Sequence, residues 1–109
     1  MTEITKPKMM DYKRQLLVCI GGKCTENGEG LALYQELKEK LKAAGLTKGE
    51  LRVIRSKVTC LGVCMSGPLV CVQPDGVWYY NINSEKLDQI IEQHLIQGNP
   101  VSEYIFHQN

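Results

Sequence analysis

The chain has 109 residues, of which 43% are hydrophobic and 23% charged, ordinary values for one soluble globular domain. No apolar run approaches the roughly 20 residues that span a bilayer, and the first residues lack the apolar stretch of a secretory signal. We therefore expect a cytoplasmic protein without membrane insertion. The formal net charge is +1 and Arg-rich runs are absent, so the composition argues against a nucleic-acid-binding surface.

The first elements follow from the pattern of apolar residues. Residues 1–13 show no periodicity and are expected to form a flexible N-terminal arm ahead of a domain at 14–109. QLLVCI at 15–20 precedes two glycines, which predicts a short buried strand. Apolar residues then recur at helical spacing over 31–44, and Gly45 is a natural stop for that helix.

The middle of the chain is predicted to form strands joined by turns. LRVIR at 51–55 alternates in the manner of a second strand, and a glycine-bearing loop is expected over 57–68. LVCVQ at 69–73 predicts a third strand and residues 77–82 a fourth. Pro-Asp-Gly at 74–76 is a strong turn signal between them, so the two strands should form a hairpin.

A second helix is expected near the carboxyl end. Ser84 is the expected N-cap, an apolar stripe follows, and Gly98 ends the pattern. Residues 101–109 then form a short extended tail. The predicted order is β-α-β-β-β-α, with a right-handed parallel crossover first and an antiparallel hairpin later. This is a mixed four-stranded sheet with two helices, the arrangement of a minimal thioredoxin-like α/β fold.

Four of the five cysteines form two close pairs, Cys19-x4-Cys24 and Cys60-x3-Cys64. Each pair follows one strand of the predicted parallel unit, and such strands end at the same edge of a sheet. The two pairs should therefore meet in space. Four soft thiolates at one point suit either Zn²⁺ or an iron–sulfur cluster.

Other interpretations of the cysteines remain open at this point. Neither pair has the x2 spacing of common zinc ribbons, or the C-x-x-C of a dithiol oxidoreductase. Buried cysteines also pack as small apolar side chains. Flanking glycines at positions 21, 22, 62 and 67 favour a cluster, because they let backbone N–H groups approach sulfur.

The segment TCLGVCMSGPLVCVQPDGVWYYNINSEKLDQIIEQHL closely resembles the bacterial thioredoxin-like 2Fe–2S ferredoxins. It is similar, less closely, to the thioredoxin-like iron–sulfur subunit of NADH dehydrogenase. The similarity extends from about Leu17 to Ile105. C-x3-C-x2-G-P followed by P-D-G-x-W-Y is its most specific part.

The resemblance implies a 2Fe–2S cluster and a role as a one-electron carrier, not an enzyme, that serves redox partner proteins as a homodimer. The ligands it implies are Cys19, Cys24, Cys60 and Cys64. The loop between the first two is short, as in the iron–sulfur protein of NADH dehydrogenase. A structural zinc domain and a redox-sensing regulatory module are the alternatives.

Several other residues carry expectations. Cys71 lies inside a predicted strand between valines and is expected to pack as an apolar side chain. His94 falls on the apolar side of the last helix and is expected to be packed there. Lys23 and Lys57 flank the cysteine pairs, and Lys13 and Arg14 begin the first strand, so these residues are expected to place positive charge near the cluster. Strands that are apolar on both faces predict cover by a second copy of the chain.

Overall fold

The structure is a computed structural model that describes residues 3–9, 11–21, 28–59 and 66–109. Five strands form one sheet in the order β2-β1-β3-β4-β5. Strands β1 and β2 are parallel, and every other neighbouring pair is antiparallel. The bounds of the strands are β1 Arg14–Cys19, β2 Val53–Val58, β3 Val70–Gln73, β4 Val77–Tyr79 and β5 Ile105–Gln108.

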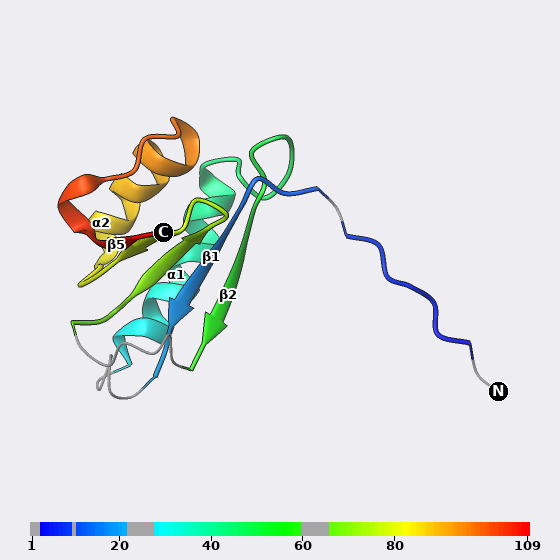
Figure 1. The fold of residues 1–109 in the computed structure, drawn as a ribbon, viewed down its shortest axis with the longest axis horizontal. Coiled ribbons are helices and arrows are strands. Elements are labelled where there is room, and N and C mark those ends of the chain that lie inside the picture. Colours follow the sequence, from blue (N-terminus) through cyan, green and yellow to red (C-terminus); the bar gives the residue numbers. More distant parts are fainter. Residues whose placement is uncertain (1–2, 10, 22–27, 60–65) are drawn as a thin grey trace.

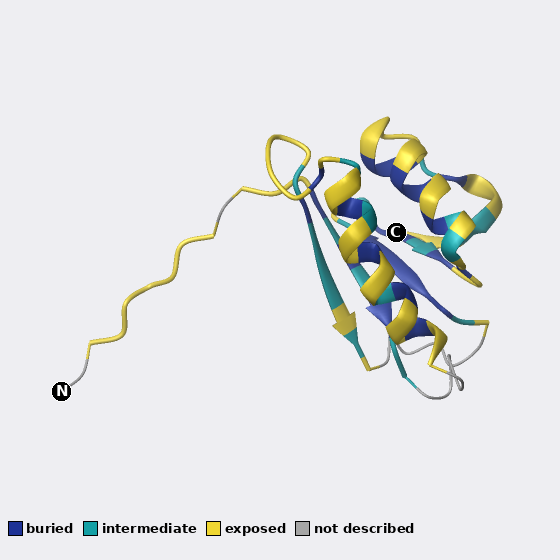
Figure 2. Ribbon diagram, turned by 180° about the vertical axis from the view of Figure 1, so that it is seen from behind, coloured by how far each residue is buried: buried dark blue, intermediate teal, exposed yellow. Residues whose placement is uncertain are grey.

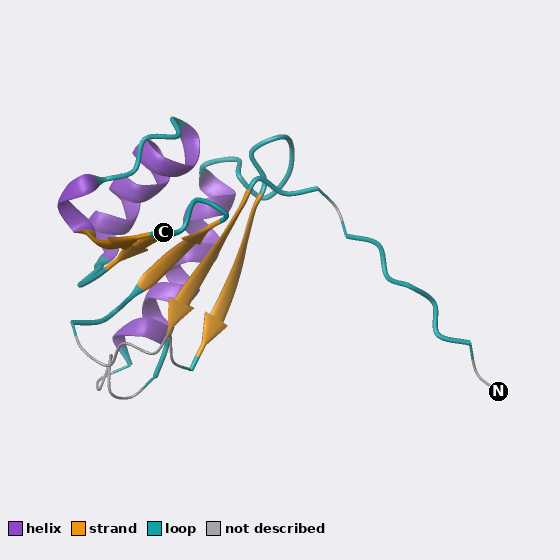
Figure 3. Cartoon of the chain, viewed as in Figure 1, coloured by secondary structure: helices purple, strands orange, loops and turns teal. Residues whose placement is uncertain are grey.

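Both helices lie against one face of this sheet (Figures 1 and 2). Helix α1 spans Glu29–Ala43, and α2 spans Ser84–Gln89 before the chain continues as a π-helix over Ile90–Ile96. The core lies between the helices and the sheet. Its members are leucines, isoleucines and valines that the alternation of the strands directs to one side, among them Leu16, Val18, Leu37, Val70, Val72, Leu87, Ile90 and Leu95. No helix among the described residues covers the opposite face of the sheet (Figure 3).

The predicted order of elements and the mixed sheet are confirmed, but the sheet has one strand more than the predicted four. Residues 101–109, expected as a tail, contain a short 3₁₀ turn and then β5. Tyr80 donates its N–H to the carbonyl of Tyr104 at 3.1 Å, and the rings of Trp78 and Phe106 meet edge to face at 6.3 Å. The fifth strand therefore arises from the open edge of β4, which no short sequence window reveals.

Other boundaries also differ from the sequence prediction. Strand β2 begins at Val53 and extends to Val58, so it includes residues expected in the following loop. The N-cap of α2 is Asn83, whose side-chain oxygen accepts from the N–H of Lys86 at 2.9 Å; Ser84 is already helical. The Gly67–Pro68 peptide bond is cis. Among the described residues, no helix is long and apolar enough to cross a bilayer.

A buried polar network closes the edge of the sheet at which β1 begins. Asp75 Oδ2 accepts from His94 Nε2 at 2.6 Å and from Arg14 Nε at 2.9 Å. The hydroxyl of Tyr79 accepts from the N–H of Val101 at 3.0 Å and donates to His94 Nδ1 at 2.8 Å. This pattern requires a neutral His94 with its proton on Nε2. His94 is fully buried, as its place in the apolar stripe predicted.

The surroundings of these two side chains shift both pKa values downward. Burial lowers the pKa of His94 by more than the carboxylate of Asp75 raises it. Burial alone would raise the pKa of Asp75, but the hydrogen bonds from His94 and Arg14 outweigh it and lower that pKa. Both groups thus resist protonation in the folded state.

We expect the free energy of unfolding to fall as the pH drops below about 6.5. The unfolded chain then protonates His94 while the folded chain does not, so the loss is up to about 1.4 kcal/mol per pH unit until the lower, folded pKa is reached. Asp75 adds a similar loss only below about pH 3.9, its unfolded pKa. Urea denaturation between about pH 8 and pH 5 measures the slope.

The slope should disappear in His94→Gln, whose side chain does not titrate. His107→Gln is the matched control, because His107 is exposed. An unchanged slope in His94→Gln would show that another group titrates in this range.

Candidate metal centre

The carboxyl ends of β1 and β2 lie at one edge of the sheet because the two strands are parallel (Figure 1). The N–H of Ile20 donates to the carbonyl of Val58 at 2.8 Å, which extends the pairing one residue beyond Cys19. On the other side of β1, the N–H of Cys19 donates to the carbonyl of Leu69 at 3.1 Å. The described ends of both cysteine-bearing loops therefore meet around the end of β1.

Cys19 is the one predicted ligand that the structure describes. It is fully buried, it is in no disulfide, and its sulfur lies 3.9 Å from the carbonyl oxygen of Thr59. Thr59 directly precedes Cys60 in the sequence. A thiol from the end of β1 thus lies beside the residue that leads into the second cysteine pair.

The backbone at this edge is closely packed. A Cβ atom on Gly21 would lie 2.0 Å from the carbonyl oxygen of Thr59 and 3.7 Å from the sulfur of Cys19. Only glycine allows the two chain segments to approach this far. The glycine that follows the first strand therefore brings the two loop ends together, and soft sulfur at such a point fits iron or zinc.

Cys24, Cys60 and Cys64 lie outside the described residues. In the sequence, Cys60 follows Thr59, and Cys64 is two residues before Ser66, both of which the structure describes. Among the described residues alone, no three His, Cys, Asp or Glu side chains gather as a metal site. The ligand set predicted from the sequence thus stays a prediction.

Cys71 lies in the middle of β3, where it is fully buried. It is opposite Leu17 of β1 and Trp78 of β4, so it belongs to the helix-free face. The side-chain amide of Gln73 donates to its sulfur at 3.2 Å. Burial raises the pKa of the Cys71 thiol, which favours a neutral side chain in a packed position.

The positive charges are distributed differently from the sequence expectation. Lys57 pairs in register with Val18, one residue before Cys19, and so lies at the end of the sheet where the loops meet. Arg14 begins β1, about 17 Å along the strand from Cys19, and its guanidinium is bound to Asp75. Arg14 and its neighbour Lys13 therefore lie at the wrong edge to act on the cysteine loops.

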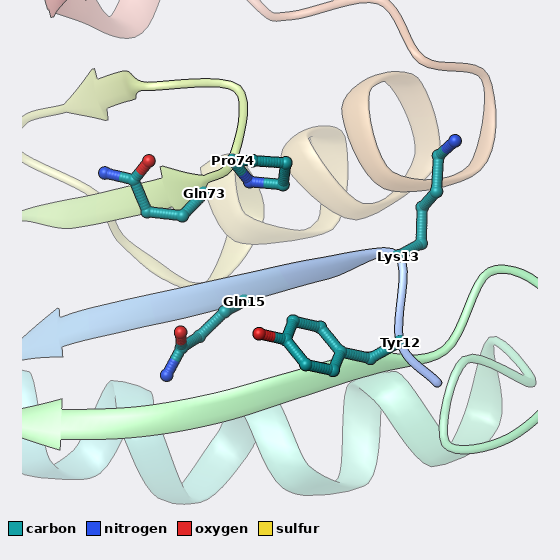
Figure 4. A pocket seen from close by; sticks show the side chains of 5 residues that line it. All are labelled: Tyr12, Lys13, Gln15, Gln73 and Pro74. Atoms are coloured by element: carbon teal, nitrogen blue, oxygen red, sulfur yellow. The ribbon is translucent and has the colours of Figure 1, made fainter. Parts of the chain in front are cut away.

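The same opposite edge holds a shallow pocket of about 280 Å³. Its walls are five side chains from the start of β1 and the end of β3: Tyr12, Lys13, Gln15, Gln73 and Pro74 (Figure 4). None of these five side chains is a thiol, and the length of β1 lies between the pocket and the cysteine loops. The pocket is therefore separate from the candidate metal centre.

One pair of residues at the cysteine edge gave no signal in the sequence. The N–H of Asn81 donates to the carbonyl of Ser66 at 2.7 Å, which ties the exit of the second cysteine loop to the end of β4. Ser66 and Asn81 are 15 residues apart, and both atoms belong to the backbone. The prolines and glycines nearby predicted turns but not this contact.

The fold defines a class of protein, a thioredoxin-like α/β domain, and it places the buried thiol of Cys19 beside the residue that precedes Cys60. A profile of the family described as "Thioredoxin-like [2Fe-2S] ferredoxin" matches residues 8–95. The chain belongs to this family, and the cofactor of the family is a 2Fe–2S cluster.

Relatives of two kinds share this sequence. A 2Fe-2S ferredoxin of Aquifex aeolicus is 35% identical over 86 residues, 77% of this chain and 73% of that protein. A 2Fe-2S ferredoxin of Clostridium pasteurianum is 28% identical over 102 residues, 85% of this chain and 95% of that protein. One subunit of the NADH-quinone oxidoreductase of Rickettsia prowazekii is 30% identical over 84 residues, 76% of this chain but only 46% of that protein.

Solved structures agree with the sequence relatives. The thioredoxin-like [2Fe-2S] ferredoxin from Aquifex aeolicus matches with a TM-score of 0.76 at 27% sequence identity. The match covers 91% of this chain and 94% of that protein. The thioredoxin-like fold is thus confirmed over nearly the whole chain.

We expect Gly21→Ala to impair metal binding, because the added methyl group forces the Thr59 carbonyl away from the end of β1. Overpacking of this kind costs about 1–3 kcal/mol. The iron content of the purified protein should fall severalfold. Gly49→Ala is the control, because it strains the backbone at φ of 90° with no atom within 4 Å of the added Cβ, before β2 and away from the cysteine loops. Equal iron in both variants would contradict the expectation.

Proposed function

We propose that this chain is a cytoplasmic one-electron carrier that holds a 2Fe–2S cluster through Cys19, Cys24, Cys60 and Cys64. The observation that carries the proposal is the meeting of both loop ends around the buried thiol of Cys19. Family membership favours iron and sulfide over zinc at this position. Four thiolates are the ligands that a 2Fe–2S cluster needs.

The protein's own groups hold the site and limit access to it. Cys19 presents its sulfur from the last residue of a central strand, whose pairing on both sides fixes its position. The close approach at Gly21 holds the two loop ends together, and Cys19 is fully buried there. The cluster, when bound, exchanges one electron between ferric and ferrous iron, and the surrounding hydrogen bonds and charges set its potential.

Two roles are compatible with this site, and the similarities favour a free carrier. The ferredoxins match over most of their length, whereas the chain spans about half the length of the NADH-quinone oxidoreductase relatives. We infer that redox partner proteins dock near the cysteine edge. A relay component within a larger oxidoreductase is the second candidate, and the similarity to the Rickettsia proteins supports it.

The cluster should be present at about two irons and two sulfides per chain in protein prepared without oxygen. Such a protein is reddish and absorbs visible light, whereas a zinc protein is colourless. Iron and sulfide assays together with the visible spectrum provide the measurement. One zinc per chain without sulfide would overturn the proposal.

Alanine at any of the four proposed ligands should remove the cluster or shorten its lifetime at least tenfold. Cys71→Ala is the matched control, because it removes the fifth cysteine from a packed position on β3. The control should keep the iron content and the visible spectrum. If Cys71→Ala lost the cluster and Cys24→Ala kept it, the ligand set would be wrong.

We also propose that two copies associate through the helix-free face of the sheet. Four apolar side chains of this face are only half-buried: Leu17, Ile54, Val58 and Trp78. Apolar strand faces of this kind need cover. A second copy of the chain provides it without another protein.

Light scattering should therefore give twice the chain mass of 12.3 kDa at micromolar concentration. Ile54→Asp places a charge on this face and should shift the mass to that of a monomer. Ile96→Asp changes an equally apolar residue that is exposed on the helical side, and it should remain dimeric. A monomeric wild-type protein would contradict the association.

A further inference from the structure

The exit of the second cysteine loop has an unusual backbone. Ser66 has φ of 58° and Asn81 has φ of 50°, and they are the two non-glycine residues with left-handed φ in the described part of the chain. A left-handed backbone conformation is energetically unfavourable for a residue other than glycine. It persists where the surrounding structure holds the residue in place. Both residues lie at the same edge of the sheet as Cys19, because a hydrogen bond joins them and Leu69, three residues after Ser66, accepts from the N–H of Cys19.

Three backbone hydrogen bonds hold the segment that leaves this loop. Ser66 accepts from the N–H of Asn81 at 2.7 Å, and Pro68 accepts from the N–H of Ile82 at 3.1 Å. Leu69 accepts from the N–H of Cys19 at 3.1 Å on the other side. The first of these bonds lies nearest to the loop, two residues after Cys64 in the sequence.

Asn81 is itself held from its carbonyl side. The ammonium group of Lys86 donates to the Asn81 carbonyl at 3.1 Å, and the N–H of Lys86 is capped by Asn83. Lys86 is the one Lys or Arg among residues 73–109. Asn81 lies two residues after the end of β4. Its own N–H donates to the Ser66 carbonyl, and the next N–H, that of Ile82, donates to the Pro68 carbonyl.

We propose that Asn81 is a positioning residue for the second cysteine loop. Its N–H holds the Ser66 carbonyl, two residues after Cys64 in the sequence, and so fixes the described end of the loop that carries this predicted ligand. The inference rests on the proposed function, since it takes Cys64 as a ligand. Asparagine suits the position because, after glycine, it adopts this conformation most readily.

The test compares variants of the cluster-loaded protein by the rate at which visible absorption is lost in excess chelator. Asn81→Val disfavours the left-handed conformation, and we expect loss roughly 5- to 30-fold faster than in the wild type. Asn81→Gly keeps the conformation without the side chain, and its rate should stay within about twofold of the wild type. Asn81→Ala replaces the valine variant if that variant does not fold, and it should accelerate cluster loss less strongly.

A matched control separates positioning from a general loss of stability. Gly49→Ala introduces a side chain at φ of 90° with no atom within 4 Å, before β2 at the opposite edge of the sheet. It should lower the urea midpoint of the protein and leave the chelation rate unchanged.

The proposal is overturned if Asn81→Val and Asn81→Ala release the cluster at the wild-type rate, or if Gly49→Ala accelerates release as much. It is also overturned if Asn81→Gly is as fast as Asn81→Val. Wild-type protein without iron and sulfide is a separate result, because it overturns the proposed function before any variant is compared.

Discussion

Most features of this protein depend on the parallel pairing of β1 with β2. The crossover through α1 places the ends of both strands at one edge, so residues near Cys19 and Thr59 meet although 40 positions separate them. An antiparallel pairing would place those ends at opposite edges. The same pairing places α1 on one face of the sheet, and no described helix covers the opposite face.

The two edges of the sheet therefore have different chemistry. One edge carries the cysteine loops, close backbone contacts and left-handed residues, features that fit a metal centre. The other edge carries the network of Arg14, Asp75, His94 and Tyr79, in which every polar group shown has a partner. That network joins β1, the hairpin turn and the π-helix, so it stabilises the fold at the end of the sheet away from the cysteine loops.

Sequence patterns were sufficient for elements that are long or strongly periodic. The helix before Gly45, the hairpin around Pro74 and the inward side of His94 were all predicted, because local apolar spacing determines which side chains face a core. The fifth strand was missed, since IFHQ is too short to show alternation and forms only against the edge of β4. Arg14 was wrongly placed near the cysteines, because it starts the strand that Cys19 ends and the strand rise separates the two by about 17 Å.

The sequence by itself determined the family to which this chain belongs and the kind of centre to expect. Two close cysteine pairs, the glycines beside them and the C-x3-C-x2-G-P segment predict a sulfur-ligated centre. Only the tertiary structure decided which backbone groups support that centre. The contacts of Gly21 with Thr59 and of Asn81 with Ser66 join residues far apart in the chain. Every residue type has the same N–H and C=O groups, proline's missing N–H aside, so side-chain identity cannot reveal such pairs.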